Sequence, residues 1–323
     1  MEAKEMDMKI GVDVYNDLYP QHLHTNQMKQ RQSPLTDEKS TAEGGIGFPE
    51  KAGVYEKGEA YDFSTYDVNS VQSTALSEGA LNSKMKTYLS ALGFYDGEED
   101  GAYTEEFKKA LKCFQKAYFG AVIYSVNNKV VDKLREKIED VGTAYYTNLT
   151  NSKLSDSLKR LGFDSTNSAE GKKNFARVQT FLEKGMGCNK YQTAGIMGNI
   201  MQESWFFPTS DNGDGAFGIL QWRSPRRGYL ENYALKNGYS SADKMGIQLA
   251  FFRYEVSKVW GKGDIDEGAP NSELVKNWNT LKNEYKSNYF GVSDFFKDNI
   301  ENCSDKSYQI RRNYSSMIYQ AIS

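Results

Sequence analysis

Hydrophobic residues recur at helical spacing through most of the chain, and the pattern is clearest between residues 191 and 204. Four apolar side chains there fall on one helical face and predict a buried helix: Ala194, Met197, Ile200 and Met201. Gly195 and Gly198 lie within the same helix, although glycine weakens a helix relative to alanine. We therefore expect another backbone to approach the helix closely at these two positions.

Similar spacing predicts helices on both sides of this stretch. We expect a helical unit at 74–129, a helical connector at 130–173 and a larger helical domain at 174–323. The expected apolar faces are Met85, Leu89 and Leu92; Phe107, Leu111 and Phe114; Val131, Leu134 and Ile138; Phe175, Val178 and Leu182; Leu230 and Tyr233; and Leu249, Phe252 and Val256. Two closing helices follow, so the predicted fold class is mainly α.

The first 73 residues lack this periodicity and predict a largely irregular arm, because most of them are polar and rich in Gly, Pro and Ser. The arm holds the only two histidines, His22 and His24, which we interpret as part of a solvated loop. Zinc hydrolases, Cys/His peptidases and Ser-His-Asp hydrolases need histidine at the active site, so these classes are disfavoured. We expect no metal and no cofactor.

The composition allows two or three globular domains and argues against several partners. Of the 323 residues 39% are hydrophobic, and no apolar run is long enough to span a bilayer. A formal net charge of −3 without a basic tract argues against nucleic acid as a partner. The opening residues do not resemble a secretory signal. Cys113, Cys188 and Cys303 are odd in number and far apart, so we expect free thiols.

Glu203 is the first candidate for chemistry. It falls on the last turn of the helix at 191–204 and is followed closely by Trp205, Phe206 and Phe207. The negative end of a helix dipole and apolar neighbours both disfavour an ionised carboxylate. A carboxyl group that keeps its proton near neutral pH can act as a general acid, so we predict this role for Glu203.

A resemblance to known enzymes begins at the same residue. Glu203-Ser204, followed by GAFGILQW at 215–222, resembles the ES…GAxGIxQ motif of goose-type lysozymes and soluble lytic transglycosylases. The fuller pattern, AGIMGNIMQES through FGILQW, is most similar to phage tail lysozymes, and the similarity covers about residues 175 to 256. This resemblance implies an α-rich lysozyme-like α+β catalytic domain with a small hairpin or loop over the cleft.

The resemblance implies cleavage of the glycan strand of bacterial peptidoglycan, with Glu203 protonating the glycosidic oxygen. A second carboxylate then acts as nucleophile or activates water, and Asp211 and Asp214 in the cleft loop are the candidates. If neither reaches the site, attack by the sugar's own 6-hydroxyl gives the anhydro product of a lytic transglycosylase. We favour muramidase-type hydrolysis, with transglycosylation or an inactive wall-binding or tail structural protein as alternatives.

The same loop supplies candidates for substrate binding. Gly218, like Gly215, permits close approach of backbone to a sugar, and Gln221 offers a donor and an acceptor to an N-acetyl group. Phe217 and Trp222 offer flat faces to a pyranose, and we weigh this role equally with core packing. Arg227 matches the arginine of the family's loop, whereas we interpret Arg223 and Arg226 as a solvated basic face. Glu255 is interpreted as structural.

The unit at 74–129 resembles the common peptidoglycan-binding domain, a small three-helix fold. The resemblance rests on Leu92-Gly93-Phe94 and on five residues that it marks as wall-binding candidates: Asp100, Gly101, Tyr103, Phe114 and Gln115. Peptidoglycan is therefore the expected partner. We expect the protein to be associated with a phage or tail-like particle or released outside the cell, and the arm to contact tail or injection-machine proteins.

Overall fold

A computed structural model describes residues 79–120, 128–160, 162, 168–257, 271–303 and 307–323. The chain divides into two units, Met1–Phe48 and Pro49–Ser323, and every described residue belongs to the second unit. The predicted arm at 1–73, with His22 and His24, lies outside the described residues.

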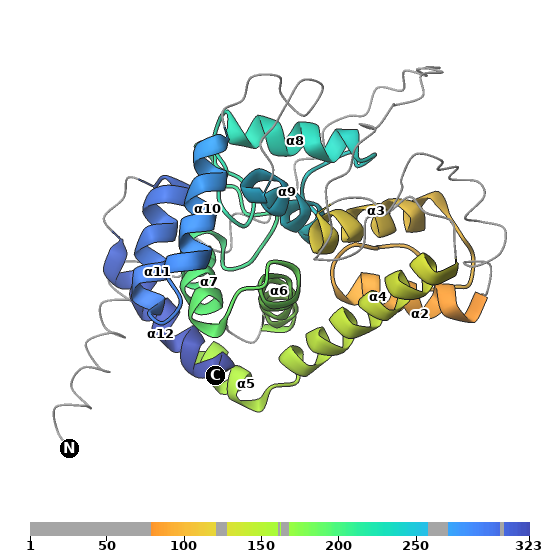
Figure 1. The fold of residues 1–323 in the computed structure, drawn as a ribbon, viewed down its shortest axis with the longest axis horizontal. Coiled ribbons are helices and arrows are strands. Elements are labelled where there is room, and N and C mark those ends of the chain that lie inside the picture. The colour runs from red at the N-terminus through yellow and green to blue at the C-terminus, as the bar shows by residue number, and fades with distance from the viewer. Residues whose placement is uncertain (1–78, 121–127, 161, 163–167, 258–270, 304–306) are drawn as a thin grey trace. The chain divides into compact units, whose positions relative to one another are not determined.

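The described part of the chain is mainly α, as predicted (Figure 1). Its first helices are α2 (Gly79–Ala91), α3 (Glu105–Phe119), α4 (Asn128–Leu149), α5 (Ser152–Arg160) and α6 (Ser168–Thr180), which continues into the π-helical turn η2 (Phe181–Gly185). The later ones are α7 (Lys190–Ser204), α8 (Arg226–Lys236), α9 (Met245–Ser257), α10 (Ser272–Glu284), α11 (Tyr289–Phe296), the π-helical turn η3 (Lys297–Glu301) and α12 (Tyr308–Ile322).

Helix α7 packs against α11 and α12 (Figure 1). All side chains from Gln192 to Met201 are buried, so the helix is enclosed on every side rather than along one face. A Cβ added at Gly195 would lie 2.8 Å from the carbonyl oxygen of Tyr289, and one at Gly198 would lie 2.8 Å from that of Arg311. The expected close approach of other backbones is therefore confirmed, and α11 and α12 provide them.

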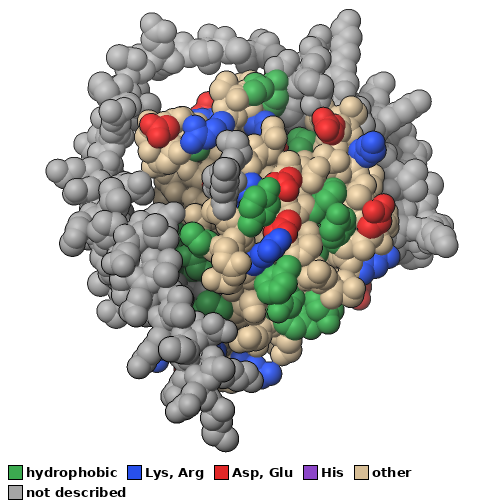
Figure 2. All heavy atoms as spheres, turned by 90° about the vertical axis from the view of Figure 1, so that its left-hand side faces the viewer, with side chains coloured by type: hydrophobic (Ala, Val, Ile, Leu, Met, Phe, Trp, Pro, Cys, Tyr) green, Lys and Arg blue, Asp and Glu red, His purple; other side chains and the backbone are tan. Residues whose placement is uncertain are grey.

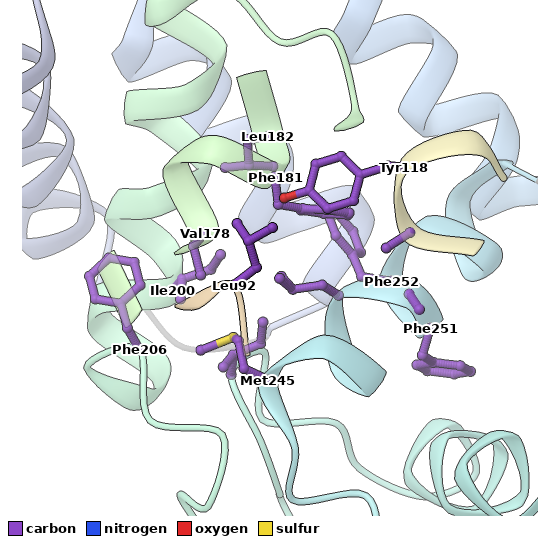
Figure 3. Packing of buried hydrophobic residues seen from close by; sticks show 14 of the residues in the cluster. Leu92, Tyr118, Val178, Phe181, Leu182, Ile200, Phe206, Met245, Phe251 and Phe252 are labelled. Carbon is purple, nitrogen blue, oxygen red and sulfur yellow. The ribbon is translucent and has the colours of Figure 1, made fainter. Parts of the chain in front are cut away.

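The helices at 79–119 share one hydrophobic core with the C-terminal helices. Figure 3 shows Leu92 and Tyr118 from this unit among side chains of α6, η2 and α9. The rings of Tyr118 and Phe181 meet edge to face with centroids 6.0 Å apart. Because contacting apolar side chains of this kind form a continuous core, the unit is fixed to the C-terminal helices rather than tethered to them.

Backbone contacts reinforce this junction at the start of α9. The amide nitrogen of Gly246 donates to the carbonyl oxygen of Gly93 at 3.0 Å. A Cβ at Gly246 would lie 2.5 Å from a ring carbon of Phe94, so only glycine fits without displacement. Arg177 of α6 also donates from Nε to the carbonyl oxygen of Ala91 at 2.8 Å.

The predicted connector consists of α4 and α5, with Leu134 and Ile138 buried as expected. Helix α4 packs against α2 and α6, and α5 packs against α12, so both helices are integrated into the fold. Helix α10 was not predicted. Its apolar residues Leu274, Trp278 and Leu281 recur at helical spacing, so the sequence did carry a signal for this helix.

The surface and the cysteines agree with the expectations from composition. On the face shown in Figure 2, acidic and basic side chains are interspersed with hydrophobic ones. Cys113, Cys188 and Cys303 are free thiols, as predicted. Over the ranges that the structure describes, every helix is too short or too polar to cross a membrane.

Candidate active site

Glu203 lies on the last turn of α7, as the sequence predicts. The helix begins with a capping box, in which the side chain of Asn189 accepts from the amide of Gln192 at 3.0 Å and the Gln192 side chain accepts from the amide of Asn189 at 3.1 Å. It ends because Trp205 and Phe206 take left-handed backbone conformations, with φ of 53° and 64°. The carboxylate therefore projects from a sharply defined helix end.

The expected apolar surroundings of Glu203 are wrong. Nη2 of Arg311, on α12, donates to Oε1 of Glu203, whose side chain is 17% exposed. Arg311 is its partner among the described residues. The nearby aromatic rings are directed elsewhere, since Phe206 is fully buried against Phe175 and Trp205 packs against Tyr314. A charge-assisted hydrogen bond thus holds the carboxylate, and such a bond stabilises an anion.

Arg311 connects Glu203 to a second carboxylate. Its Nη1 donates to Oε2 of Glu301 at 2.9 Å and to Oδ1 of Asn199 at 2.9 Å. The side chains of Arg311 and Glu301 are 1% and 3% exposed. Asn199 lies one turn before Glu203 on α7, so α7, η3 and α12 meet at one guanidinium group.

Asn199 anchors this arrangement to the buried interior. Its Nδ2 donates to the carbonyl oxygens of Gly195 at 2.9 Å and Ser293 at 3.1 Å, which directs its Oδ1 towards Arg311. Because the side-chain nitrogen and oxygen of Asn199 are both hydrogen-bonded, its Oδ1 is a fixed acceptor for the guanidinium group of Arg311.

Sequence reasoning missed Arg311, Glu301 and Asn199, although α12 carried a usable indication of the first. The buried positions of this helix include Arg311, Tyr314, Ile318 and Ile322, which recur every three or four residues. An arginine at a core-facing position of an apolar repeat requires a buried acidic partner, because an unpaired buried charge is costly.

The loop after α7, residues 208–222, is fastened beside Glu203. Ser204, next to Glu203, donates from Oγ to the carbonyl oxygen of Ile219 at 2.9 Å. The fully buried Gln248 of α9 accepts from the amide of Ile219 at 2.9 Å and donates to the carbonyl oxygen of Pro208 at 2.7 Å. One buried amide side chain thus holds both ends of the loop, a role that sequence reasoning missed.

The loop forms isolated antiparallel bridges, in agreement with the predicted loop or small hairpin. The bridges join Asp211 to Phe217 and Phe217 to Trp222. At Gly218 a Cβ would lie 2.7 Å from Oε1 of Gln248, so protein fills the space on this side of the residue, and its contact with a sugar stays a prediction. Gly218 has a left-handed backbone conformation, with φ of 81°, which glycine adopts without strain, and it packs against the side chain of Gln248.

Three of the predicted residues come together on this loop and α8. Nη1 of Arg227 lies 3.5 Å from Oδ2 of Asp211, and its guanidinium carbon lies 5.1 Å from the ring centre of Phe217. Nε of Arg227 also donates to Oε1 of Glu231 at 2.9 Å. Asp211, Phe217 and Arg227 are all partly accessible, so the group can meet a ligand.

Asp214 lies apart from these three residues. Its side chain is exposed, and its carbonyl oxygen accepts from Nη1 of Arg223 at 3.1 Å. Gly213 and Gly215, on either side of Asp214, have φ of 78° and 87° and open space within 4 Å of a would-be Cβ, so both face away from protein atoms. The second carboxylate stays a prediction for Asp211 and Asp214 alike.

Trp222 and Gln221 serve the loop's own structure. Trp222 is 1% exposed and donates from Nε1 to Oε2 of Glu255 at 3.2 Å, which agrees with core packing, the role weighed equally with stacking on a sugar. The side-chain Nε2 of Gln221 donates to the carbonyl oxygens of Ser210 at 3.1 Å and Gly218 at 3.0 Å. Its donors are therefore occupied within the loop rather than directed at an N-acetyl group.

Glu255 and Arg226 form a buried ion pair, which agrees with a structural Glu255. Nε and Nη2 of Arg226 donate to the two carboxylate oxygens at 2.5 and 2.7 Å, and Glu255 is fully buried. The expectation that Arg226 lies on a solvated face is wrong. Its Nη1 donates to the carbonyl oxygen of Ile300 at 2.8 Å, which ties α8 to η3.

The candidate wall-binding residues divide into two groups. Asp100 is half exposed and accepts from Nζ of the buried Lys86 at 2.5 Å, and this hydrogen bond holds the pKa of Asp100 below its ordinary value. Gly101 packs against Gly79, since a Cβ would lie 2.6 Å from the Cα of that residue. Tyr103 is partly exposed, so Asp100 and Tyr103 have surface available for a ligand.

Phe114 and Gln115 belong to the second group, which is enclosed in the core. Phe114 is fully buried and stacks on Tyr118 with ring centroids 4.7 Å apart, while Gln115 is 6% exposed. Packed protein surrounds both side chains, and a contact with the wall stays a prediction for these two residues. Their spacing in the motif reflects the core of α3.

Comparison with known proteins assigns both parts of the described chain. Residues 173–322 match the family model for phage tail lysozyme. Residues 79–122 match the family model named "Putative peptidoglycan binding domain". No curated protein and no solved structure matches the chain. The two matches agree with the expected order of a phage tail lysozyme domain preceded by a peptidoglycan-binding domain, and they support a lysozyme-like function at the bacterial cell wall.

Proposed function

We propose that this protein hydrolyses the glycan strand of bacterial peptidoglycan as a muramidase, with Glu203 as the general acid. The observation that carries the proposal is Glu203 itself, a partly accessible carboxyl group at the end of α7 within the phage tail lysozyme domain. The adjacent loop is fastened by Ser204 and Gln248, so it can keep a bound strand in register with the acid.

Asp211 is the better candidate for the second carboxylate. It is partly exposed and lies beside Arg227 and Phe217, which together offer a cation and an aromatic face to an acidic sugar chain. In this proposal Asp211 acts on the opposite side of the sugar ring from Glu203, as nucleophile or by activating water. Asp214 is the alternative because its carboxylate is exposed in the same loop.

One observation supports a lytic transglycosylase as a second candidate. Oδ1 of Asp211 accepts from the amide of Gly213 at 2.8 Å, and Oδ2 faces Arg227. If these contacts persist with substrate, Asp211 is held away from the sugar. The 6-hydroxyl of muramic acid then attacks the anomeric carbon after Glu203 protonates the leaving oxygen, and the product carries an anhydromuramic end.

The preceding unit is proposed to bind the wall through Asp100 and Tyr103, the candidates with exposed surface. We further propose the domain division 74–129, 130–173 and 174–323 for binding, connecting and catalytic parts. Carriage on a phage tail, with the arm at 1–73 contacting tail proteins, is proposed on the family match alone.

The test is mass spectrometry of purified peptidoglycan digested by the wild-type protein and by Glu203→Gln. Reducing-end muramic acid is expected from the wild type, and its loss is expected from the variant. Glu284→Gln is the matched control, since Glu284 is also on the last turn of a helix, α10, and is exposed.

Each product contradicts a different part of the proposal. Anhydromuramic ends would replace hydrolysis by transglycosylation, and reducing-end glucosamine would indicate a glucosaminidase. Equal digestion by wild type and Glu203→Gln would remove Glu203 from catalysis. A wild-type protein that binds peptidoglycan and releases no fragments would favour the inactive wall-binding alternative.

A further inference from the structure

We infer that Glu301 is a positioning residue for Glu203, acting through the guanidinium group of Arg311. The inference rests on the proposed function, because it concerns the protonation of the general acid. Glu301 makes no contact with substrate in this scheme. Glu301 pairs with the same arginine as Glu203, so its negative charge offsets part of the positive charge that acts on Glu203.

The geometry places the two carboxylates on different nitrogens of one group. Nη2 of Arg311 donates to Glu203, and Nη1 donates to Glu301 at 2.9 Å. Arg311 cannot turn away from either, because Nη1 also donates to Asn199 and Nε donates to Ser307 at 2.9 Å. The guanidinium is therefore a rigid bridge of the kind that arginine's planar fork favours.

Burial makes this bridge electrostatically effective. Arg311 and Glu301 are almost fully enclosed, so water screens their charges poorly. Glu203 is the more exposed carboxylate, which leaves it the member of the pair able to exchange a proton with a substrate. A general acid held by an arginine alone would be kept as an anion, and a second carboxylate on that arginine opposes this effect.

The surrounding charged groups are engaged with partners of their own. Three ion pairs lie on the neighbouring elements: Arg226 of α8 with Glu255 of α9, Lys297 with Asp298 within η3, and Arg312 of α12 with Asp294 of α11. Cys303 also lies here, with its sulfur 3.6 Å from Nη2 of Arg311. Removing the charge of Glu301 leaves the hydrogen bonds of these three pairs in place. The change acts on Arg311 and Glu203, and also on Arg226, with which the Glu301 carboxylate interacts electrostatically.

The inference predicts the sign of a pH shift. Glu301→Gln keeps an acceptor for Nη1 but deletes one negative charge, so the guanidinium favours the Glu203 anion more strongly. Glu203 then loses its proton at lower pH, and the alkaline limb of glycan cleavage moves down by about one pH unit. Glu301→Asp keeps the charge and is expected to retain a profile near that of the wild type.

Asp298→Asn is the matched control. Asp298 lies on the same turn as Glu301, yet it contacts Lys297 and Tyr308 instead of Arg311. The same loss of one carboxylate charge there is expected to leave the profile within about 0.3 pH units of the wild type. A loss of stability alone would lower the amount of active protein without moving the limb.

A readout without substrate separates this inference from the proposed function. Carbon-13 NMR of the Glu203 carboxyl, identified by its loss in Glu203→Gln, follows its titration in each variant. A midpoint lower by about one unit in Glu301→Gln, with Asp298→Asn unchanged, supports the inference whether or not the protein cleaves glycan. Equal midpoints in wild type and Glu301→Gln, or equal shifts in both variants, overturn it. An inactive wild type would instead overturn the proposed function.

Discussion

Replacement of Gly198 by alanine tests whether the contact between α7 and α12 positions the candidate site. A Cβ at this position would lie 2.1 Å from Oγ of Ser315, 2.8 Å from its amide nitrogen and 2.8 Å from the carbonyl oxygen of Arg311. Ser315 can rotate its hydroxyl, but only by giving up its hydrogen bond to the Arg311 carbonyl. The two backbone atoms can move only if α12 moves.

These contacts give a net loss of about 1 to 3 kcal/mol in the free energy of unfolding. Overpacking of a close-fitted interior costs roughly 1 to 3 kcal/mol, and the lost buried hydrogen bond about 1 kcal/mol more. Alanine returns about 1 kcal/mol through its higher helix propensity. The steric cost therefore exceeds the gain in helix propensity.

Gly228→Ala is the matched control, because Gly228 is also helical, on α8, but has nothing within 4 Å of its would-be Cβ. There the helix propensity acts alone, and a gain of about 0.5 to 1 kcal/mol is expected. Urea denaturation followed by circular dichroism at 222 nm compares the two variants. If Gly198→Ala unfolds at the same urea concentration as Gly228→Ala, or at a higher one, the argument from close packing is refuted.

Three further predictions concern the loop, the thiols and the first helical unit. Gln248→Ala leaves several buried backbone groups without their partner, so we expect a loss of about 3 kcal/mol on urea denaturation. Burial raises the pKa of Cys113 to about 12 and that of Cys188 to about 11, so at pH 8 both should resist a thiol reagent until the protein unfolds. The hydrogen bond from Lys86 lowers the pKa of Asp100 in the folded protein. The ionised Asp100 therefore stabilises the fold fully above the pKa that it has in the unfolded chain, and this contribution is lost as the pH falls through its pKa in the folded protein. Asp100→Asn should therefore reduce the loss of stability between about pH 5 and pH 3, measured by urea denaturation.

The sequence was sufficient for the elements that local pattern controls. Ala194, Met197 and Ile200 share a helical period, and the prediction that Gly195 and Gly198 admit another backbone is confirmed. The end of that helix near Glu203 was predicted correctly, because the residues before it are periodic and those after it are not. Such features depend on neighbours within a few turns of the chain.

The sequence was insufficient where a partner lies far away in the chain. Arg311 is 108 residues from Glu203, and no local pattern links the two. Aromatic residues in the motifs posed the same difficulty. Trp222 and Phe114 are suited both to stacking on a sugar and to filling a core, and only their burial at 1% and 0% distinguishes the two.

The organisation of the site explains why these long-range partners matter for function. A carboxyl group at the C-terminal end of a helix is weakly oriented on its own, because the helix ends there and the side chain is partly in solvent. Arg311 restricts Glu203 from α12, and Gly198 lets α12 approach closely enough to do so. Glu301 shares the same guanidinium group, and in our proposal it acts on the protonation of Glu203 through that group. In this proposal one buried arginine links the position of Glu203 to its protonation, so a variant that moves α12 should disturb both together.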